Sequence, residues 1–426
     1  MKTFLKKLFP ASWKLVLLSI ALGILMFFAA EFLLALIRAI SNLTFFGEID
    51  LHSNELPHAG SYLILIIPLI GALSLGLMAR YLDHGIRGHG IPEVIERIES
   101  HKSNIPFKLL WLRPIACAIS IGTGGPYGAE GPVIGMGGAF GSFIGRLFKL
   151  KETEKKILLA AGAAAGISAV FGVPVGAVFL VSELFTRNQN IKNLFPIAIA
   201  SLFAYIARVI FMGEKPLFHI NFEAFHLTPE VLGAFGIVAI ILGVTAALSI
   251  YAVEFFEDCY EKLPVHWMWW PMIGVLPLVV FAFFYPDILG PSYELLQSLF
   301  EIQDSYSLII KLAIIKGVVW AFAVSSRTTS GTLAPLLIFG AGVGLLSFTQ
   351  IAPLLGISPD IYPVAALIGA GAYFGAISGA PVSSALIVLE MTGSLSLLPV
   401  SFGTCLTAVL VTKALVSKSI MQTEYS

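Results

Sequence analysis

Long apolar segments, separated by short polar stretches, dominate this chain. An α-helix needs about 20 consecutive apolar residues to cross a bilayer. The pattern therefore predicts membrane-spanning helices at residues 16–37, 62–78, 157–184, 194–211, 231–253, 272–284, 307–322, 333–348, 364–389 and 397–416. Residues 109–148 are equally apolar but are interrupted by glycine. This region indicates broken or re-entrant helices rather than one long span.

Polar segments mark the expected connections between these helices. Residues 149–156 read KLKETEKK and predict a charged loop, and residues 213–230 predict a loop in the middle of the molecule. The aromatic cluster HWMWWPM at residues 266–272 is typical of an anchor at the membrane interface. Ordinary packing is the alternative explanation for that cluster. The basic N-terminus lacks a small-residue cleavage site, so we expect a retained helix rather than a signal peptide.

Composition separates this chain from soluble proteins. Of its 426 residues, 57% are hydrophobic and only 12% are charged, and the mean hydropathy is +0.89. Because soluble domains carry about 25% charged residues, we expect an all-α polytopic membrane protein. Its 40 glycines and 23 prolines indicate many short, tilted and broken helices. We expect a single transmembrane domain over residues 1–426, with no soluble regulatory domain.

Charge and cysteine content narrow the range of partners. The formal net charge is zero, so the chain has no basic excess that would indicate nucleic acid. Cys117, Cys259 and Cys405 lack the spacing of metal ligands or disulfides, and we interpret them as packing residues. We expect no metal. Lysine and arginine gather around the first, second and last apolar segments, which predicts that both termini are cytoplasmic.

The two halves of the chain resemble each other. Residues 162–183 read GAAAGISAVFGVPVGAVFLVSE, and residues 369–390 read GAGAYFGAISGAPVSSALIVLE. Without gaps, they share glycine, alanine, proline, valine and the final glutamate at matching places. The match indicates a duplication, with one repeat at about 60–213 and the other at about 231–416. Duplicated halves with broken helices are typical of transporters whose site lies between the halves.

Three turns combine glycine with a following proline: GHGIPE at residues 88–93, GAEGP at 128–132 and GTLAP at 331–335. Proline is favoured at the first position of a helix, so each turn predicts a helix start. Helix N-termini carry partial positive charge and free N–H donors, which suit a dehydrated anion. Helix packing explains one such turn alone. Three turns in one membrane chain favour a shared anion site that holds no full positive charge.

Glu130 is the sharpest candidate residue. It lies within a glycine-rich turn in the otherwise uncharged stretch 114–142. Carboxylates inside a membrane are costly and usually functional. Beside helix N-termini, this carboxylate would occupy the position of an anion, and its protonation or movement would free that position. A carboxylate that only caps a helix is the alternative.

In their order, the three turns resemble the signature motifs of the CLC chloride channel and transporter family, usually written GSGIP, GxEGP and GxFxP. The resemblance covers about residues 17–416 and includes the stretch GAPVSSALIVLEMTG. It implies a prokaryotic-type protein without CBS domains, built as two inverted repeats. It also implies a homodimer in a bacterial inner membrane, with one pathway for chloride and related anions in each subunit and no cofactor.

The resemblance also assigns site residues. Glu130 matches the gating glutamate of the family, and Thr332 and Leu333 match residues whose backbone amides bind the central anion. The full set of implied anion-binding residues is His89, Gly90, Ile91, Gly131, Thr332, Leu333 and Met421. The candidate proton path comprises Glu130, Glu183 and Leu184.

Several positions depart from the family pattern. His89 replaces a serine, which bears on the preference between chloride and nitrate, and Ala129 replaces a basic residue before the gate. His89 would either act on the anion or pack as a neutral side chain. Met421 takes the position of an anion-coordinating tyrosine. Leu184 stands where the exchangers of the family carry an inner glutamate on the proton path.

We therefore expect passive, chloride-selective conduction gated by Glu130, because a leucine at position 184 cannot relay protons. The alternative is proton-coupled chloride exchange in which Glu183 or water replaces the missing relay. Glu183 could equally be a structural carboxylate that caps neighbouring backbone, and Glu390 at the matching position of the repeat favours this interpretation. The intact Pro132 favours chloride over fluoride, since fluoride-specific relatives usually depart in that turn.

An enzyme within the membrane is a third hypothesis, but the sequence gives it little support. Residues 325–331 offer hydroxyls, and His84 and His89 offer bases. However, the sequence contains neither a G-x-S-x-G nor an H-E-x-x-H motif. We therefore expect a transport protein and not an enzyme.

Overall fold

The computed structural model describes residues 13–51, 56–88, 105–185, 191–220, 228–301, 306–329 and 331–416. All regular elements in these ranges are helices. The α-helices are α2 (Trp13–Phe46), α3 (Leu63–Tyr81), α5 (Leu109–Gly122), α6 (Glu130–Leu147), α7 (Glu152–Phe171), α8 (Pro174–Phe185), α9 (Ile191–Met212), α10 (Pro229–Glu261), α11 (Trp270–Gly274), α12 (Leu276–Phe284), α13 (Tyr293–Glu301), α14 (Tyr306–Val324), α15 (Leu333–Ile351), α16 (Tyr362–Ser378), α17 (Pro381–Thr392) and α18 (Leu398–Leu415). Short 3-10 helices are η1 (His84–Ile86), η2 (Trp267–Trp269), η3 (Pro286–Ile288), η4 (Ala352–Leu355), η5 (Pro359–Ile361) and η6 (Leu395–Leu397).

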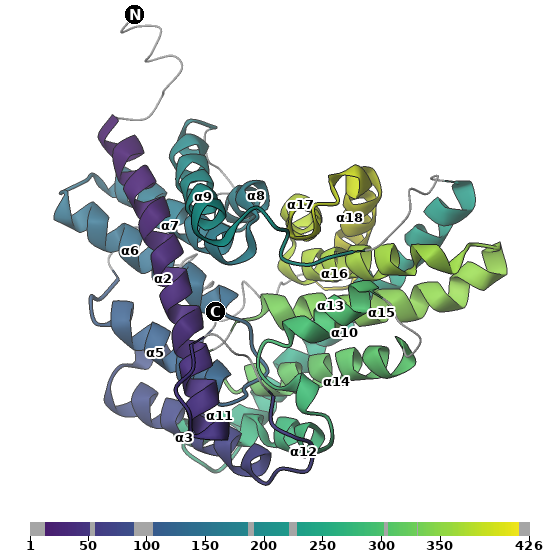
Figure 1. Cartoon of the computed structure of the whole chain (residues 1–426), viewed down its shortest axis with the longest axis horizontal. Coiled ribbons are helices and arrows are strands. Elements are labelled where there is room, and N and C mark those ends of the chain that lie inside the picture. Colours follow the sequence, from purple (N-terminus) through teal and green to yellow (C-terminus); the bar gives the residue numbers. More distant parts are fainter. Residues whose placement is uncertain are drawn as a thin grey trace, which may run out of the picture.

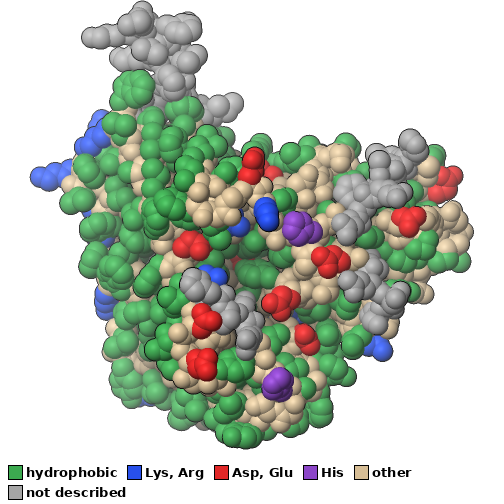
Figure 2. All heavy atoms as spheres, viewed as in Figure 1, with side chains coloured by type: hydrophobic (Ala, Val, Ile, Leu, Met, Phe, Trp, Pro, Cys, Tyr) green, Lys and Arg blue, Asp and Glu red, His purple; other side chains and the backbone are tan. Residues whose placement is uncertain are grey.

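Most of the expected membrane helices are present, but the segment 157–184 is not one continuous span. Within the described residues, nine helical stretches are long and apolar enough to cross a membrane. Their outer faces carry large apolar side chains that are exposed over about half of their surface, among them Phe28 and Phe32 on α2 and Leu248 on α10. Figure 2 shows such side chains over much of one face of the molecule. Lipid is the solvent that suits this surface, because apolar patches of this extent are rare on soluble monomers.

Several apolar segments that look continuous in the sequence are broken in the structure. The region 109–148 divides into α5 and α6, as its glycines predict. The segment 157–184 breaks between α7 and α8, where Gly172 adopts a left-handed φ of 68° and Pro174 starts the next helix. The segment 364–389 breaks in the same way between α16 and α17, at Gly379 with φ 75° and Pro381. A left-handed residue followed by proline stops one helix and starts another.

The two halves pack with the same order of partners. In the first half α7 lies against α6, α8 and α9, and in the second half α16 lies against α15, α17 and α18. The first-half helices are purple to teal in Figure 1, and the second-half helices are green to yellow. The halves meet where α8 packs against α17 and where the N-terminal end of α6 approaches α15. This arrangement brings the glycine-rich turns at 128–132 and 331–335 together between the two halves.

Two local features differ from the expectation. More than half of the charged segment 149–156 is helical, because α7 begins at Glu152. The carboxylate of Glu154 accepts a hydrogen bond from the Lys151 backbone N–H at 3.2 Å and so caps that helix start. The sequence also gave no expectation for α13, a short amphipathic helix between α12 and α14.

Candidate anion pathway

The N-termini of α6 and α15 come together inside the protein. Glu130 is the first residue of α6, and Leu333 is the first residue of α15. The turns before these helices are joined by a backbone hydrogen bond from Gly128 N–H to the Gly331 carbonyl, at 3.2 Å. A side chain at Gly331 would collide with the Gly128 carbonyl, so only glycine permits this approach. Two helix N-termini, with their partial positive charges, thus face one buried region.

The Glu130 side chain fills that region. It is only 2% exposed. Its Oε1 accepts a hydrogen bond from the Tyr293 hydroxyl at 2.9 Å. Its Oε2 has no hydrogen-bond partner of normal geometry among the described residues. The carboxylate lies at the start of α6, where the partial positive charge of a helix N-terminus favours a negative group.

A second polar atom beside the two helix starts, after Glu130 Oε2, also lacks a partner among the described residues. Gly131, Thr332 and Leu333 are all buried. The Thr332 hydroxyl, like Glu130 Oε2, has no hydrogen-bond partner among the described residues. Buried polar atoms without a partner are uncommon in folded proteins. A water between the α6 and α15 starts would bond to both atoms, and a bound anion would accept a hydrogen bond from the Thr332 hydroxyl.

The segment before the glycine-rich turn at residues 88–93 is held near α15. Arg113 of α5 donates two hydrogen bonds to the Gly85 carbonyl, from Nε at 2.9 Å and from Nη2 at 2.8 Å. The hydroxyl of Thr329, shortly before α15, donates to the Ile86 carbonyl. These bonds fix η1 between α5 and the approach to α15. His89, Gly90 and Ile91 themselves lie outside the described residues, and so does Met421.

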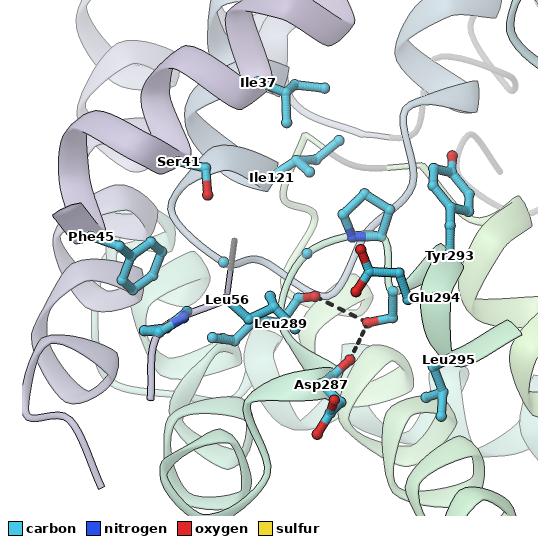
Figure 3. Close-up of a pocket in the computed structure, with 15 residues that line it drawn as sticks. Ile37, Ser41, Phe45, Leu56, Ile121, Asp287, Leu289, Tyr293, Glu294 and Leu295 are labelled. Carbon is cyan, nitrogen blue, oxygen red and sulfur yellow. Dashed lines mark hydrogen bonds between the residues drawn. The ribbon is translucent and has the colours of Figure 1, made fainter. Parts of the chain in front are cut away.

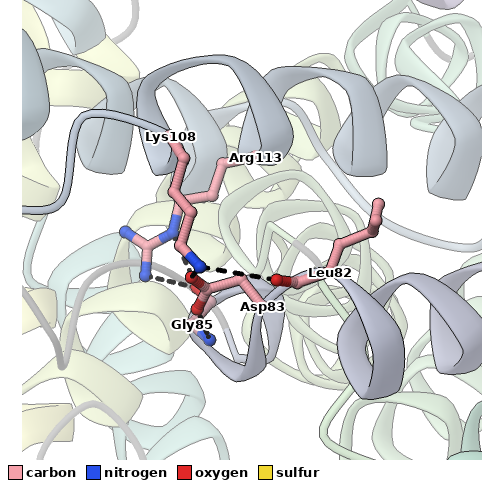
Figure 4. A network of polar contacts seen from close by, with 5 residues as sticks. All are labelled: Leu82, Asp83, Gly85, Lys108 and Arg113. Carbon is pink, nitrogen blue, oxygen red and sulfur yellow. Dashed lines mark hydrogen bonds and ion pairs between the residues drawn. The ribbon is translucent and has the colours of Figure 1, made fainter.

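An ion pair fixes the start of η1 (Figure 4). The Asp83 carboxylate lies 2.6 Å from Lys108 Nζ and accepts a hydrogen bond from Gly85 N–H at 2.7 Å. Partial burial opposes ionisation of Asp83, but these two hydrogen bonds and the charges of Lys108 and Arg113 outweigh it. Together they hold the pKa of Asp83 below its usual value.

A cavity of about 130 Å³ lies next to Tyr293. The end of α2 lines one side of it with Ile37, Ser41 and Phe45, and residues 287–295 line the other. Figure 3 shows Tyr293 and Glu294 at its edge. Within the described residues, no group of histidine, cysteine and acidic side chains is arranged to hold a metal ion.

Glu183 and Leu184, the other two members of the candidate proton path, lie at the end of α8. The Glu183 carboxylate accepts hydrogen bonds from the backbone N–H groups of Val382 and Ser383, at 3.1 and 2.9 Å, and from the Ser383 hydroxyl at 2.6 Å. Leu184 is 5% exposed and belongs to the apolar core. Glu183 therefore caps α17, in agreement with its interpretation as a structural carboxylate rather than a proton relay.

Two residues of the site did not emerge from the sequence. Tyr293 carries no local signal, because its contact with Glu130 spans 163 positions. Lys316 did carry a local signal in the sequence, since a charged side chain inside the apolar segment 307–322 is costly in a membrane. It is fully buried, and its ammonium donates to the Ile288 and Gly290 carbonyls and to the Ser292 hydroxyl.

Comparison with known proteins identifies the family. Residues 70–413 match the family model described as voltage gated chloride channel. The H(+)/Cl(-) exchange transporter ClcA of Vibrio parahaemolyticus is 27% identical over 370 residues, which cover 83% of this chain and 76% of that protein. An uncharacterised protein of Methanocaldococcus jannaschii is 27% identical over 351 residues, covering 80% of this chain and 83% of that protein.

Solved structures share the fold. A slow cyanobacterial Cl−/H+ antiporter superposes with a TM-score of 0.82 at 22% identity, covering 96% of this chain and 97% of that one. A CLC-type fluoride/proton antiporter gives 0.78 at 22% identity, covering 95% and 97%. The fold is thus the expected one of short, tilted and broken helices in two inverted repeats. With its apolar helices and the match to the family model, the chain is an integral membrane protein of the CLC chloride channel and transporter family.

Proposed function

We propose that this protein exchanges chloride for protons across its membrane and that Glu130 is the gate. One observation carries the proposal: the Glu130 carboxylate is buried where the N-termini of α6 and α15 meet. A carboxylate and a chloride ion compete for the same partial positive charges. Protonation removes the charge of Glu130 and lets chloride take its place, so proton binding and anion movement are linked at one position.

Passive chloride conduction, which the sequence favours through Leu184, is the second candidate. Two relatives at 27% identity, from Vibrio parahaemolyticus and Vibrio campbellii, are named H(+)/Cl(-) exchange transporters, and this supports exchange over passive conduction. Because position 184 is a leucine, protons would have to reach Glu130 from the inner side without a carboxylate at position 184. Because Glu183 already caps α17, we propose that water rather than Glu183 completes the path.

We propose the same anion-binding residues that the family resemblance implies. The backbone amides of Gly131, Thr332 and Leu333 would bind chloride between α6 and α15, and His89, Gly90, Ile91 and Met421 would face it from the inner side. The Thr332 hydroxyl supports this assignment, because it is buried and has no hydrogen-bond partner in the part of the chain that the structure describes. Chloride is the preferred ion in this proposal because Pro132 is intact, and no cofactor takes part.

The remaining expectations from the sequence belong to the same proposal. The protein would work as a homodimer with one pathway in each subunit. It would lie in a bacterial inner membrane with both termini in the cytoplasm, as the distribution of lysine and arginine predicts. The repeats at about 60–213 and 231–416 would form one transmembrane domain. The matching order of helix contacts in the two halves supports the duplication.

Chloride efflux from liposomes tests the role of Glu130. We expect efflux from vesicles that contain the wild-type protein to rise as the pH falls, and Glu130→Gln to remove this dependence while efflux continues. Glu294→Gln is the matched control, because Glu294 is an exposed carboxylate next to the site. If Glu130→Gln kept the wild-type pH dependence, Glu130 would not be the gate.

A further inference from the structure

We propose that Tyr293 is a positioning residue that latches Glu130 in the anion-blocking position, and that transport requires this latch to open. The inference rests on the proposed gating role of Glu130. Its starting point is the hydrogen bond that the Tyr293 hydroxyl donates to Glu130 Oε1, at 2.9 Å. Among the described residues, it is the one side-chain hydrogen bond that Glu130 accepts.

The Tyr293 ring is held from two sides. Phe171, at the end of α7, meets it edge to face with the ring centroids 6.4 Å apart. Phe218 contacts it at 6.1 Å and packs in turn against Phe300 of α13, at 5.8 Å. Phe171 and Phe218 are 1% and 3% exposed. Edge-to-face aromatic contacts restrict ring orientation. The Tyr293 hydroxyl therefore points to the position of the Glu130 carboxylate whether or not the carboxylate is there.

The backbone before Tyr293 is held by Lys316. The ammonium of this buried α14 residue donates to the Ile288 carbonyl at 2.7 Å, to the Gly290 carbonyl, and to the Ser292 hydroxyl at 2.9 Å. The Gly290 N–H also donates to the Gly124 carbonyl at 3.1 Å, which ties the loop to the end of α5. The latch is therefore a preformed part of the scaffold. Glu130 is the partner that must move.

A hydrogen bond from a hydroxyl stabilises a carboxylate more than a neutral carboxyl group. Tyr293 therefore favours the ionised, blocking form of Glu130. Without the hydroxyl, Glu130 would accept a proton and leave the site at a lower proton concentration. The midpoint of the curve of chloride efflux against pH would then move to higher pH, and efflux at neutral pH would rise.

The test compares Tyr293→Phe with Tyr373→Phe in proteoliposomes. Tyr373 is a matched control, because its buried hydroxyl donates to Ser249 at 2.7 Å and does not contact Glu130. We expect Tyr293→Phe to raise the midpoint by roughly one pH unit, equivalent to about a tenfold change in proton affinity, and Tyr373→Phe to leave it unchanged. An unchanged midpoint in Tyr293→Phe, or an equal shift in Tyr373→Phe, would overturn the latch.

A second comparison separates the latch from the proposed function. In a Glu130→Ala background, Tyr293→Phe should have no further effect on efflux, because the group that it latches is gone. An effect of the same size in both backgrounds would mean that Tyr293 acts only through the packing of α13, and the latch would be wrong. If Glu130→Ala alone kept the full pH dependence, the gating role of Glu130 would fail together with the latch.

Discussion

Glu183 and Glu390 each cap the helix that carries the other. Glu183, near the end of α8, accepts backbone hydrogen bonds from the second and third residues of α17, Val382 and Ser383. Glu390, near the end of α17, accepts them from the second and third residues of α8, Val175 and Gly176, at 3.1 and 2.7 Å. The two glutamates occupy matching positions of the internal duplication. Their bonds tie the two halves of the molecule together where α8 packs against α17.

This reciprocity predicts that Glu183→Gln and Glu390→Gln have similar effects. Each substitution weakens charge-assisted bonds to a helix N-terminus, so we expect each to cost about 1–3 kcal/mol of stability. Thermal unfolding of the purified protein in detergent measures this cost. Coupled proton movement should survive in both variants. If Glu183→Gln alone abolished proton movement, Glu183 would be a proton relay and not only a cap.

The contact between the two glycine-rich turns predicts that Gly331→Ala is harmful. Its new methyl group would meet the backbone carbonyl of Gly128, which cannot move aside without shifting the start of α6. We expect a loss of about 1–3 kcal/mol in stability and a strong loss of chloride efflux. Gly236→Ala is the control, since Gly236 is exposed on α10 and nothing surrounds its Cα. Normal efflux in Gly331→Ala would argue against close contact of the turns.

The buried hydrogen bonds of Lys316 lead to a second prediction about stability. Lys316→Met shortens the side chain by one atom and leaves two buried carbonyls and a hydroxyl without their donor. The expected cost is roughly 2–5 kcal/mol, because unsatisfied buried acceptors are expensive. Lys311→Met, at an exposed position of the same helix, should change the unfolding temperature little. Equal unfolding temperatures for the two variants would show that Lys316 does not hold the loop before Tyr293.

Asp83 predicts a small dependence of stability on pH. Its pKa is lower in the folded protein than in the unfolded chain, so its contribution is present above the unfolded pKa of about 3.9. That contribution disappears as the pH falls through the lower, folded pKa. Because Lys108 is largely exposed, the ion pair is worth no more than about 1 kcal/mol. Wild type should exceed Asp83→Asn in stability at pH 7 and match it in strong acid. An equal difference at both pH values would contradict the assignment.

The sequence predicted the fold through its local signals. Apolar length located the membrane helices, but it predicted 157–184 and 364–389 as continuous and missed the breaks at Gly172 and Gly379. The glycine–proline turns at 128–132 and 331–335 predicted two helix starts, and α6 and α15 begin there, two residues before each proline. Its place in an otherwise uncharged, glycine-rich stretch singled out Glu130 among the 26 acidic residues of the chain, and the family motifs then agreed.

Contacts between distant residues could not be predicted in this way. The bond from Tyr293 to Glu130 depends on where α13 lies, and α13 has too few apolar residues to stand out as a membrane helix. The sequence favoured a capping role for Glu183 through Glu390 at the matching repeat position, but its partners on α17 could not be predicted. For Lys316 the charge was visible in the sequence. Its partners, the carbonyls of the loop before α13, were not.

Proton movement driven by a chloride gradient is the most direct test of the proposed exchange. Liposomes containing the purified protein are given a chloride gradient without a pH gradient, and internal pH is recorded with and without a proton ionophore. We predict that the wild-type protein drives protons uphill, that Glu130→Gln does not, and that Leu184 is no obstacle to coupling. Chloride movement by the wild-type protein with no change in internal pH would contradict exchange and would make the protein a passive chloride pathway.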